Sequence, residues 1–219
     1  MRVTRRELGA GTAALALAGA VLSVGTGGLG FVLPAFADVS NEELMAPSPL
    51  GEKTQGDPKA PVTLIEYAAV TCPHCADFFM HQFPELKSKY IDTGKVHFIF
   101  REFPLNALDV AGFMLARCAG DDKFFPIVDT LFEKQRDWVV QKPLEPLLAI
   151  AKQAGFTKES FDTCLTNQKV EDGVKWVRER ASEKFGVSGT PTFFINGKKY
   201  TGNPNAADLG KQIDSYLKS

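Results

Sequence analysis

The chain has 219 residues, of which 44% are hydrophobic and 23% are charged, and its formal net charge at pH 7 is −1. This composition is ordinary for a globular protein and excludes a disordered chain or a fibrous repeat. The near-neutral charge lacks the basic excess of a nucleic-acid-binding protein, so no nucleic-acid partner is expected. The four cysteines are too few for a small disulfide-stapled fold, but their even number suits two pairs.

The first 37 residues have the composition of a targeting segment. Three arginines and one glutamate near the start precede an uncharged stretch rich in Ala, Leu and Val, which ends in Ala-Phe-Ala at 35–37. This pattern predicts an export signal that is cleaved after Ala37. The arginine pair at positions 5 and 6 resembles a twin-arginine signal. The alternative is a retained transmembrane helix, because about 20 apolar residues suffice to span a bilayer.

Hydrophobic periodicity divides the rest of the chain into two sheet-forming parts with a helical part between them. Pro and Gly residues are frequent in residues 38–58, which are predicted to form an N-terminal arm. Pro84 lies inside the first predicted helix and predicts a kink there. The predicted elements are strands at 62–69, 96–103, 192–195 and 198–201, with an Asn-Gly turn between the last two, and helices at 73–90, 106–119, 122–137, 143–154, 158–167, 168–185 and 205–217.

The sequence Cys72-Pro73-His74-Cys75 lies where a predicted strand ends and a helix begins. Residues i and i+3 share one face of a helix, so the two sulfurs can close and reopen a disulfide. Cys72 at the helix start lies among unpaired backbone N–H groups, which lower the pKa of its thiol. A protonated His74 would act in the same direction. Because a stabilised thiolate is a good leaving group, a disulfide of this kind is oxidising.

Two other interpretations of the Cys-Pro-His-Cys motif stay open. The pair could be a structural disulfide, or it could be half of a zinc site. A zinc site would need further ligands at suitable spacing, and only His81 and His97 remain as histidines outside the motif. No metal site is expected from these residues.

The run Glu-Tyr-Ala-Ala-Val-Thr-Cys-Pro-His-Cys at 66–75, together with Gly-Thr-Pro-Thr-Phe at 189–193, resembles the DsbA family of thioredoxin-fold thiol–disulfide oxidoreductases. The resemblance covers the chain from about Gly56 to its end. It implies an α/β, thioredoxin-like fold with an all-helical domain inserted. The two halves of the thioredoxin fold are then expected at 59–104 and 187–219, with the insertion at 105–186.

The resemblance also assigns roles to single residues. Cys72 is implied to be the exposed nucleophile and Cys75 the buried resolving cysteine. Thr190-Pro191 matches the family's cis-proline loop, which faces the active-site disulfide and where a substrate peptide could pair as an added strand. The alternative for Pro191 is an ordinary trans proline that opens a strand. Glu66 is implied to be a buried acid with a raised pKa that accepts a proton from Cys75, although it could also be a strand-end carboxylate that reaches water.

Cys118 and Cys164 lie in two predicted helices of the insertion. In an oxidising compartment, a structural disulfide is the expected fate of such a pair, with two separate buried thiols as the alternative. The pair resembles the second, non-catalytic pair of some alphaproteobacterial members of the family.

The implied function is a periplasmic enzyme that introduces disulfides into unfolded or reduced exported polypeptides. It would need no metal or organic cofactor, because the two sulfurs carry the electrons. A DsbB-like membrane partner would reoxidise it, and an apolar surface around Cys72, His74 and Pro191 would bind both substrate and partner. A monomer is expected, since only a short arm precedes the core. The alternatives are a disulfide isomerase or reductase with the same site, and a metal-binding or adaptor module that uses Cys72, Cys75 and a histidine.

Overall fold

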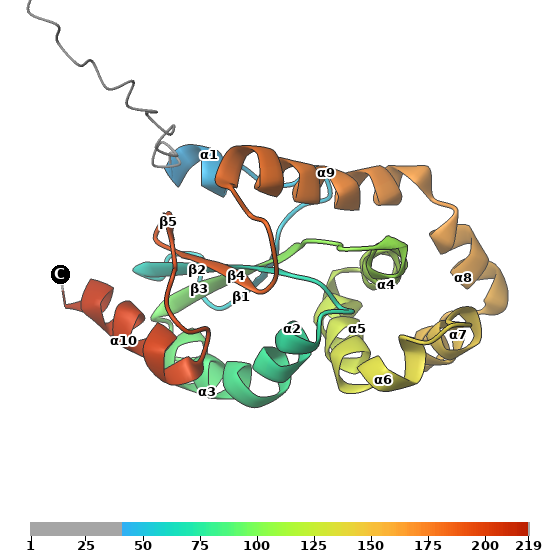
Figure 1. The fold of residues 1–219 in the computed structure, drawn as a ribbon, viewed down its shortest axis with the longest axis horizontal. Helices are drawn as coiled ribbons and strands as arrows, with labels where there is room; N and C mark the ends of the chain where they lie inside the picture. The colour runs from blue at the N-terminus through green and yellow to red at the C-terminus, as the bar shows by residue number, and fades with distance from the viewer. Residues whose placement is uncertain (1–40, 219) are drawn as a thin grey trace, which may run out of the picture. The chain divides into compact units, whose positions relative to one another are not determined.

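The computed structural model describes residues 41–218, and a five-stranded sheet lies at its centre (Figure 1). The first elements along the chain are α1 (Asn41–Met45), β1 (Lys53–Gln55), β2 (Val62–Ala68), α2 (Pro73–Asp77), the π-helical segment η1 (Phe78–Gln82), α3 (Phe83–Leu86), the π-helical segment η2 (Lys87–Ile91) and β3 (Val96–Glu102). They are followed by α4 (Ala107–Cys118), α5 (Asp121–Glu133), α6 (Gln135–Trp138), α7 (Leu144–Gln153), α8 (Lys158–Leu165), α9 (Gln168–Phe185), β4 (Thr192–Ile195), β5 (Lys198–Lys199) and α10 (Ala206–Leu217). The predicted export signal at 1–37, with its cleavage position, lies outside the described residues.

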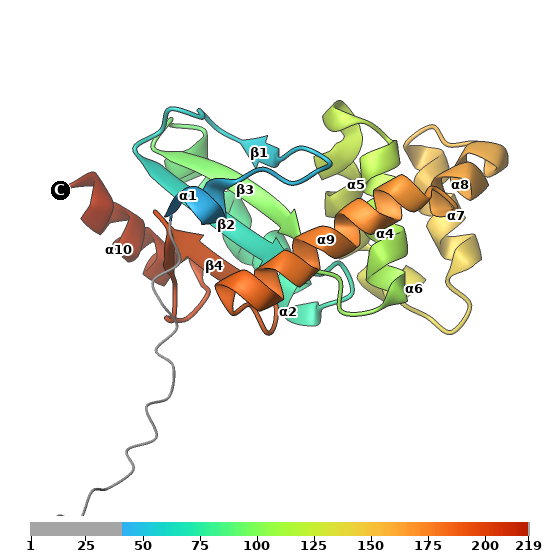
Figure 2. The same ribbon diagram turned by 90° about the horizontal axis from the view of Figure 1, so that it is seen from above.

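The strand order is β1-β3-β2-β4-β5, and only β2 and β3 run parallel to each other. Helices α1 and α9 cover one face of the sheet, and α2, α3 and α10 cover the other (Figure 1). Seen from above, α9 runs from the sheet towards the other helices that follow β3 (Figure 2). A mixed α/β architecture with a helical insertion between β3 and β4 was predicted, and the structure confirms it.

Side chains of β2 alternate between two separate hydrophobic clusters, as the two-residue period of a strand requires. Ile65 and Tyr67 pack with residues of α9, such as Val177. Leu64 packs in the larger cluster on the opposite face, which also contains Cys72 and Cys75. Glu66 shares the face of Leu64, so its carboxylate points into this larger cluster.

The single helix that was predicted at 73–90 is interrupted by two π-helical segments. The backbone N–H of Phe83 bonds to the carbonyl of Phe78, five residues earlier, and Pro84 follows in the first turn of α3. Proline has no N–H and its ring clashes with the preceding turn, so a local widening of the helix accommodates it. The predicted irregularity at Pro84 is therefore present as a π segment that precedes the proline.

The arm that was predicted at 38–58 contains α1 and the edge strand β1, which pairs antiparallel with β3. Side chains from the body of the protein hold it in place. Arg101 Nη1 donates to the Leu44 carbonyl at 2.7 Å, and Arg117 Nη1 donates to the carbonyls of Leu50 and Gly51 at 2.9 and 2.8 Å. The sequence of β1 has only three residues, so it carries no detectable strand periodicity.

Smaller differences affect element ends. The helix predicted at 122–137 is divided into α5 and α6 at Lys134, whose backbone leaves the helical region with φ −98° and ψ 19°. Strand β5 spans two residues, shorter than the predicted 198–201.

Between residues 41 and 218, none of the helices is both long enough and apolar enough to cross a membrane.

Candidate active site

Cys72 follows the turn at the end of β2 and is the N-cap of α2, with φ −77° and ψ 120°. It was predicted to lie at the start of the helix, and it lies one position before the first helical residue, Pro73. An N-cap side chain is directed towards the backbone N–H groups of the second and third helical residues, which here are His74 and Cys75. The local sequence therefore places a sulfur where unpaired amides can stabilise a negative charge.

Cys72 and Cys75 are free thiols in this structure, and both are buried. Cys75 has no exposed surface and Cys72 has 6%, so the expectation of an exposed Cys72 is wrong. The loop at 190–191 accounts for the cover, because the Thr190 carbonyl oxygen lies 3.4 Å from Cys72 Sγ.

The two thiols have opposite acidity. The pKa of Cys72 is lowered from 9.0 to about 5, chiefly by a hydrogen bond from the Cys75 thiol, which outweighs the effect of burial. The Thr190 side chain and the backbone amides of Cys75 and His74 lower it further. Burial raises the pKa of Cys75 well above 9.0, and the hydrogen bond to Cys72 and the charge on Glu66 add to this rise. At neutral pH the pair therefore carries one thiolate, on Cys72.

His74 contributes to this asymmetry through its backbone N–H. Its imidazole side chain is exposed and lines a groove beside the cysteine pair. A protonated His74 ring was expected to act in the same direction, but the groups that lower the Cys72 pKa are Cys75, Thr190 and the backbone amides of His74 and Cys75.

Glu66 lies fully buried in the middle of the sheet, where its neighbours across β3 and β4 are Phe100 and Phe193. Neither carboxylate oxygen has a hydrogen-bond partner among residues 41–218. Burial, followed by the charge on Cys72, raises the pKa of Glu66 from 4.5 to about 8. The side chain does not reach water, so the interpretation as a strand-end carboxylate is excluded.

The Thr190-Pro191 peptide bond is cis. The residue pair precedes β4, and its backbone faces Cys72. In the dithiol the Cys72 thiol donates to the Thr190 carbonyl. The Thr190 hydroxyl oxygen is buried and has no other hydrogen-bond partner within the described part of the chain, so it can donate to the Cys72 thiolate once the proton has left.

A groove of about 490 Å³ adjoins the cysteine pair on the side of His74 and Pro191. We expected an apolar surface here, but most of the side chains that line the groove are polar. Its lining residues are His74, Asp77, Phe78, Gln82, Thr190, Pro191, Asn203, Pro204 and Asn205. The loop that connects β5 to α10 supplies the two asparagines, and Asn205 also caps α10.

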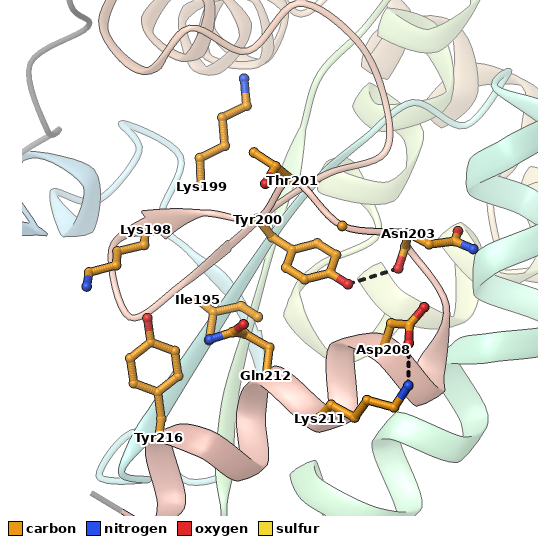
Figure 3. A pocket seen from close by; sticks show the side chains of 11 residues that line it. Ile195, Lys198, Lys199, Tyr200, Thr201, Asn203, Asp208, Lys211, Gln212 and Tyr216 are labelled. Carbon is orange, nitrogen blue, oxygen red and sulfur yellow. Dashed lines mark hydrogen bonds and ion pairs between the residues drawn. The ribbon is translucent and has the colours of Figure 1, made fainter.

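A larger pocket of about 620 Å³ lies between the β4–β5 hairpin and α10, and it includes neither cysteine nor Pro191 (Figure 3). Its walls carry lysine and tyrosine side chains together with Asp208. Lys211 and Asp208 form an ion pair at 2.8 Å, and the Tyr200 hydroxyl donates to the Asn203 carbonyl at 3.1 Å (Figure 3). The charged side chains at this pocket are buried only slightly, and no redox-active group lines it.

Sequence reasoning missed two polar residues that contact the turn before Cys72. Gln135 on α6 donates from Nε2 to the carbonyls of Val70 and Cys72. Asp109 on α4 accepts hydrogen bonds from the backbone N–H and the hydroxyl of Thr71. Asp109 carries a local signal, because it forms a capping box with Asn106, but Gln135 carries none.

Cys118 on α4 and Cys164 on α8 form a disulfide with a Cα–Cα distance of 6.1 Å. The bond links two helices of the insertion, separate from the Cys72–Cys75 pair. Among residues 41–218, no group of three or more His, Cys, Asp or Glu side chains is arranged to bind a metal ion.

Comparison with known proteins assigns the fold to a family. Residues 50–215 match the family described as Thioredoxin. A Rickettsia bellii protein named "Putative protein-disulfide oxidoreductase" is 35% identical over 164 residues, which cover 73% of this chain and 63% of the relative. The chain thus spans less than two thirds of that relative. A Bacillus anthracis protein named "Probable disulfide bond formation protein D" is 30% identical over 180 residues, which cover 76% of this chain and 79% of the relative.

Among solved structures, Wolbachia pipientis alpha-DsbA1 superimposes with a TM-score of 0.74 at 34% identity, and the match covers 82% of this chain and 96% of that protein. Residues 50–215, which match the family model, contain the Cys-Pro-His-Cys motif, the cis-proline loop and the helical insertion. The chain therefore belongs to the DsbA family of proteins with a thioredoxin-like fold and a helical insertion.

Proposed function

We propose that this protein is a periplasmic thiol–disulfide oxidoreductase that introduces disulfides into exported proteins through Cys72 and Cys75. The opposite acidity of the two thiols is the observation that supports this proposal most strongly. At pH 7, a pKa of about 5 in place of 9.0 favours the reduced protein by about 2.7 kcal/mol, or about 100-fold. A protein that is more stable when reduced transfers its disulfide readily to other thiols.

The reaction begins with the oxidised protein, in which Cys72 and Cys75 are joined. A substrate thiolate attacks Cys72 Sγ, a mixed disulfide forms, and Cys75 leaves as a thiolate. Glu66, whose pKa of about 8 keeps it largely protonated at neutral pH, supplies a proton to Cys75. The second substrate thiolate then attacks the substrate sulfur of the mixed disulfide, and Cys72 leaves as a stabilised thiolate. Two electrons move from the substrate dithiol to the protein dithiol.

During reoxidation the proton moves in the opposite direction, from Cys75 to Glu66. The Cys75 thiol must lose its proton before it can attack a mixed disulfide at Cys72, and ionised Glu66 accepts that proton. A carboxyl group with a pKa near the working pH serves both directions. We propose a DsbB-like membrane protein as the oxidant, and we propose that the enzyme works as a monomer.

The cis-proline loop supports substrate binding beside Cys72. Thr190 presents backbone groups next to the sulfur, just before β4 begins. An extended substrate segment could pair there as an additional strand, with its cysteine directed at Cys72. The polar groove lined by His74 and Pro191 would receive side chains that flank the substrate cysteine.

Equilibration of the protein with glutathione buffers, followed by alkylation and mass spectrometry, tests the proposal. We expect a strongly oxidising Cys72–Cys75 pair and loss of all thiol oxidation in Cys72→Ser. The double variant with Cys118→Ala and Cys164→Ala, which removes the other cysteine pair, is the control that retains activity. A potential near the −270 mV typical of thioredoxin would identify a reductase and overturn the proposal. Activity that disappears on exhaustive chelation would identify a metal-dependent module.

A further inference from the structure

We infer that Gln135, on the helical insertion, is a positioning residue that fixes the direction of the Cys72 side chain and thereby tunes its reactivity. The inference deepens the proposed function, on which it rests. Its basis is a pair of hydrogen bonds between the insertion and the turn that carries the reactive sulfur.

Gln135 Nε2 lies 2.9 Å from the Val70 carbonyl oxygen and 3.0 Å from the Cys72 carbonyl oxygen. A primary amide nitrogen has two hydrogens, so one glutamine can donate to both carbonyls at once. Its own position is held by α6, where Trp138 is fully buried and donates from Nε1 to the Leu131 carbonyl at 2.7 Å. The donor therefore belongs to a well-anchored element.

The same turn is held from the opposite side by α4. Asp109 Oδ1 accepts from the Thr71 backbone N–H at 2.7 Å, and Asp109 Oδ2 accepts from the Thr71 hydroxyl at 2.9 Å. The backbone N–H of Cys72 bonds to the Ala69 carbonyl at 3.1 Å. Val70, Thr71 and Cys72, the three residues before α2, thus each have a peptide group held by a side chain of the insertion.

The Cys72 carbonyl is the group through which this restraint reaches the sulfur. It belongs to the peptide unit that joins Cys72 to Pro73, so holding it fixes ψ of Cys72 and the orientation of the sulfur relative to the amides of His74 and Cys75. These amides stabilise the thiolate. The Cys72 carbonyl also accepts from the Ala76 N–H at 3.1 Å, so α2 keeps its first hydrogen bond when Gln135 is replaced.

Gln135→Met tests the inference, because methionine has similar length but no hydrogen-bond donor. Thiolate absorbance at 240 nm is titrated for the whole purified protein, and the equilibrium constant with glutathione is measured in parallel. We expect the pKa of Cys72 to rise by about one unit, which corresponds to an about tenfold loss of oxidising strength at pH 7. Gln168→Met, at an exposed position in the first turn of α9, is the matched control and should leave both quantities unchanged.

Gln135→Asn provides a second measurement if the methionine variant fails to fold. Its side chain keeps the donors but is one methylene too short to reach both carbonyls, so the pKa of Cys72 should again rise. A variant that folds with a lower Tm and the wild-type pKa would overturn the inference and leave Gln135 a purely structural role. A wild-type Cys72 pKa close to 9 would instead refute the proposed function itself, and it would be seen before any variant is compared.

Discussion

The Cys75 thiol is the largest contributor to the lowered pKa of Cys72, and its removal should therefore make Cys72 less acidic. A hydrogen bond to a charged group contributes about 1.5–3 kcal/mol, which corresponds to about 1–2 pKa units. We predict that Cys75→Ala raises the Cys72 pKa from about 5 to between about 6 and 7. Cys75→Ser keeps a hydroxyl that can donate to the thiolate, so its Cys72 pKa should stay near the wild-type value.

Thiolate absorbance at 240 nm is a clean assay for this pair of variants. Cys118 and Cys164 are joined in a disulfide, so Cys72 is the single free thiol in each variant. Equal pKa values near 5 in Cys75→Ala and Cys75→Ser would refute the reasoning. The helix amides and Thr190 would then be sufficient to stabilise the thiolate without Cys75.

Three further predictions concern the surroundings of the pair. Burial raises the pKa of Glu66, so the stability that its proton provides is complete below pH 4.5 and is lost as the pH rises through about 8. In urea unfolding of the reduced protein, the free energy of unfolding of Glu66→Gln should equal that of the wild type at pH 4. At pH 9 it should be higher than that of the wild type by up to about 5 kcal/mol. Equal free energies of unfolding at both pH values would contradict the raised pKa of Glu66. Thr190→Val removes a donor to the thiolate but keeps the side-chain shape, and the 240 nm titration should show a Cys72 pKa that rises by less than in Cys75→Ala. The double variant Cys118→Ala and Cys164→Ala should lose about 2–4 kcal/mol of unfolding free energy in denaturant titrations and retain the wild-type Cys72 pKa; a changed pKa would show that the two cysteine pairs are coupled.

Much of the fold could be predicted because its central elements have strong local patterns. The apolar run of β2 and the alternation in β3 identified both parallel strands, and the long amphipathic stripe of α9 was placed at 168–185 as observed. The Cys-Pro-His-Cys motif located the redox pair, since proline and a following helix are readable from the sequence alone.

The missed features depend on contacts between residues that are distant in the sequence. Gln135 reaches the Cys72 carbonyl across 63 positions, and no spacing rule indicates that an α6 glutamine will meet this turn. The cover over Cys72 comes from Thr190, which is 118 positions away, so the burial of the nucleophile could not be inferred from the helix start. The polar lining of the groove also comes partly from residues distant in the sequence from the cysteines, in the loop before α10.

The attachment of the arm to the body of the protein determines where a recombinant chain can begin. Arg101 is 4% exposed, and its guanidinium bonds to Glu52 and to the Leu44 carbonyl. A shortened chain that starts at residue 56 would remove both of these acceptors and leave the Arg101 guanidinium without its ion-pair partner, which is destabilising. Expression boundaries for biochemical work should therefore be placed upstream of α1, even though the family match begins at residue 50.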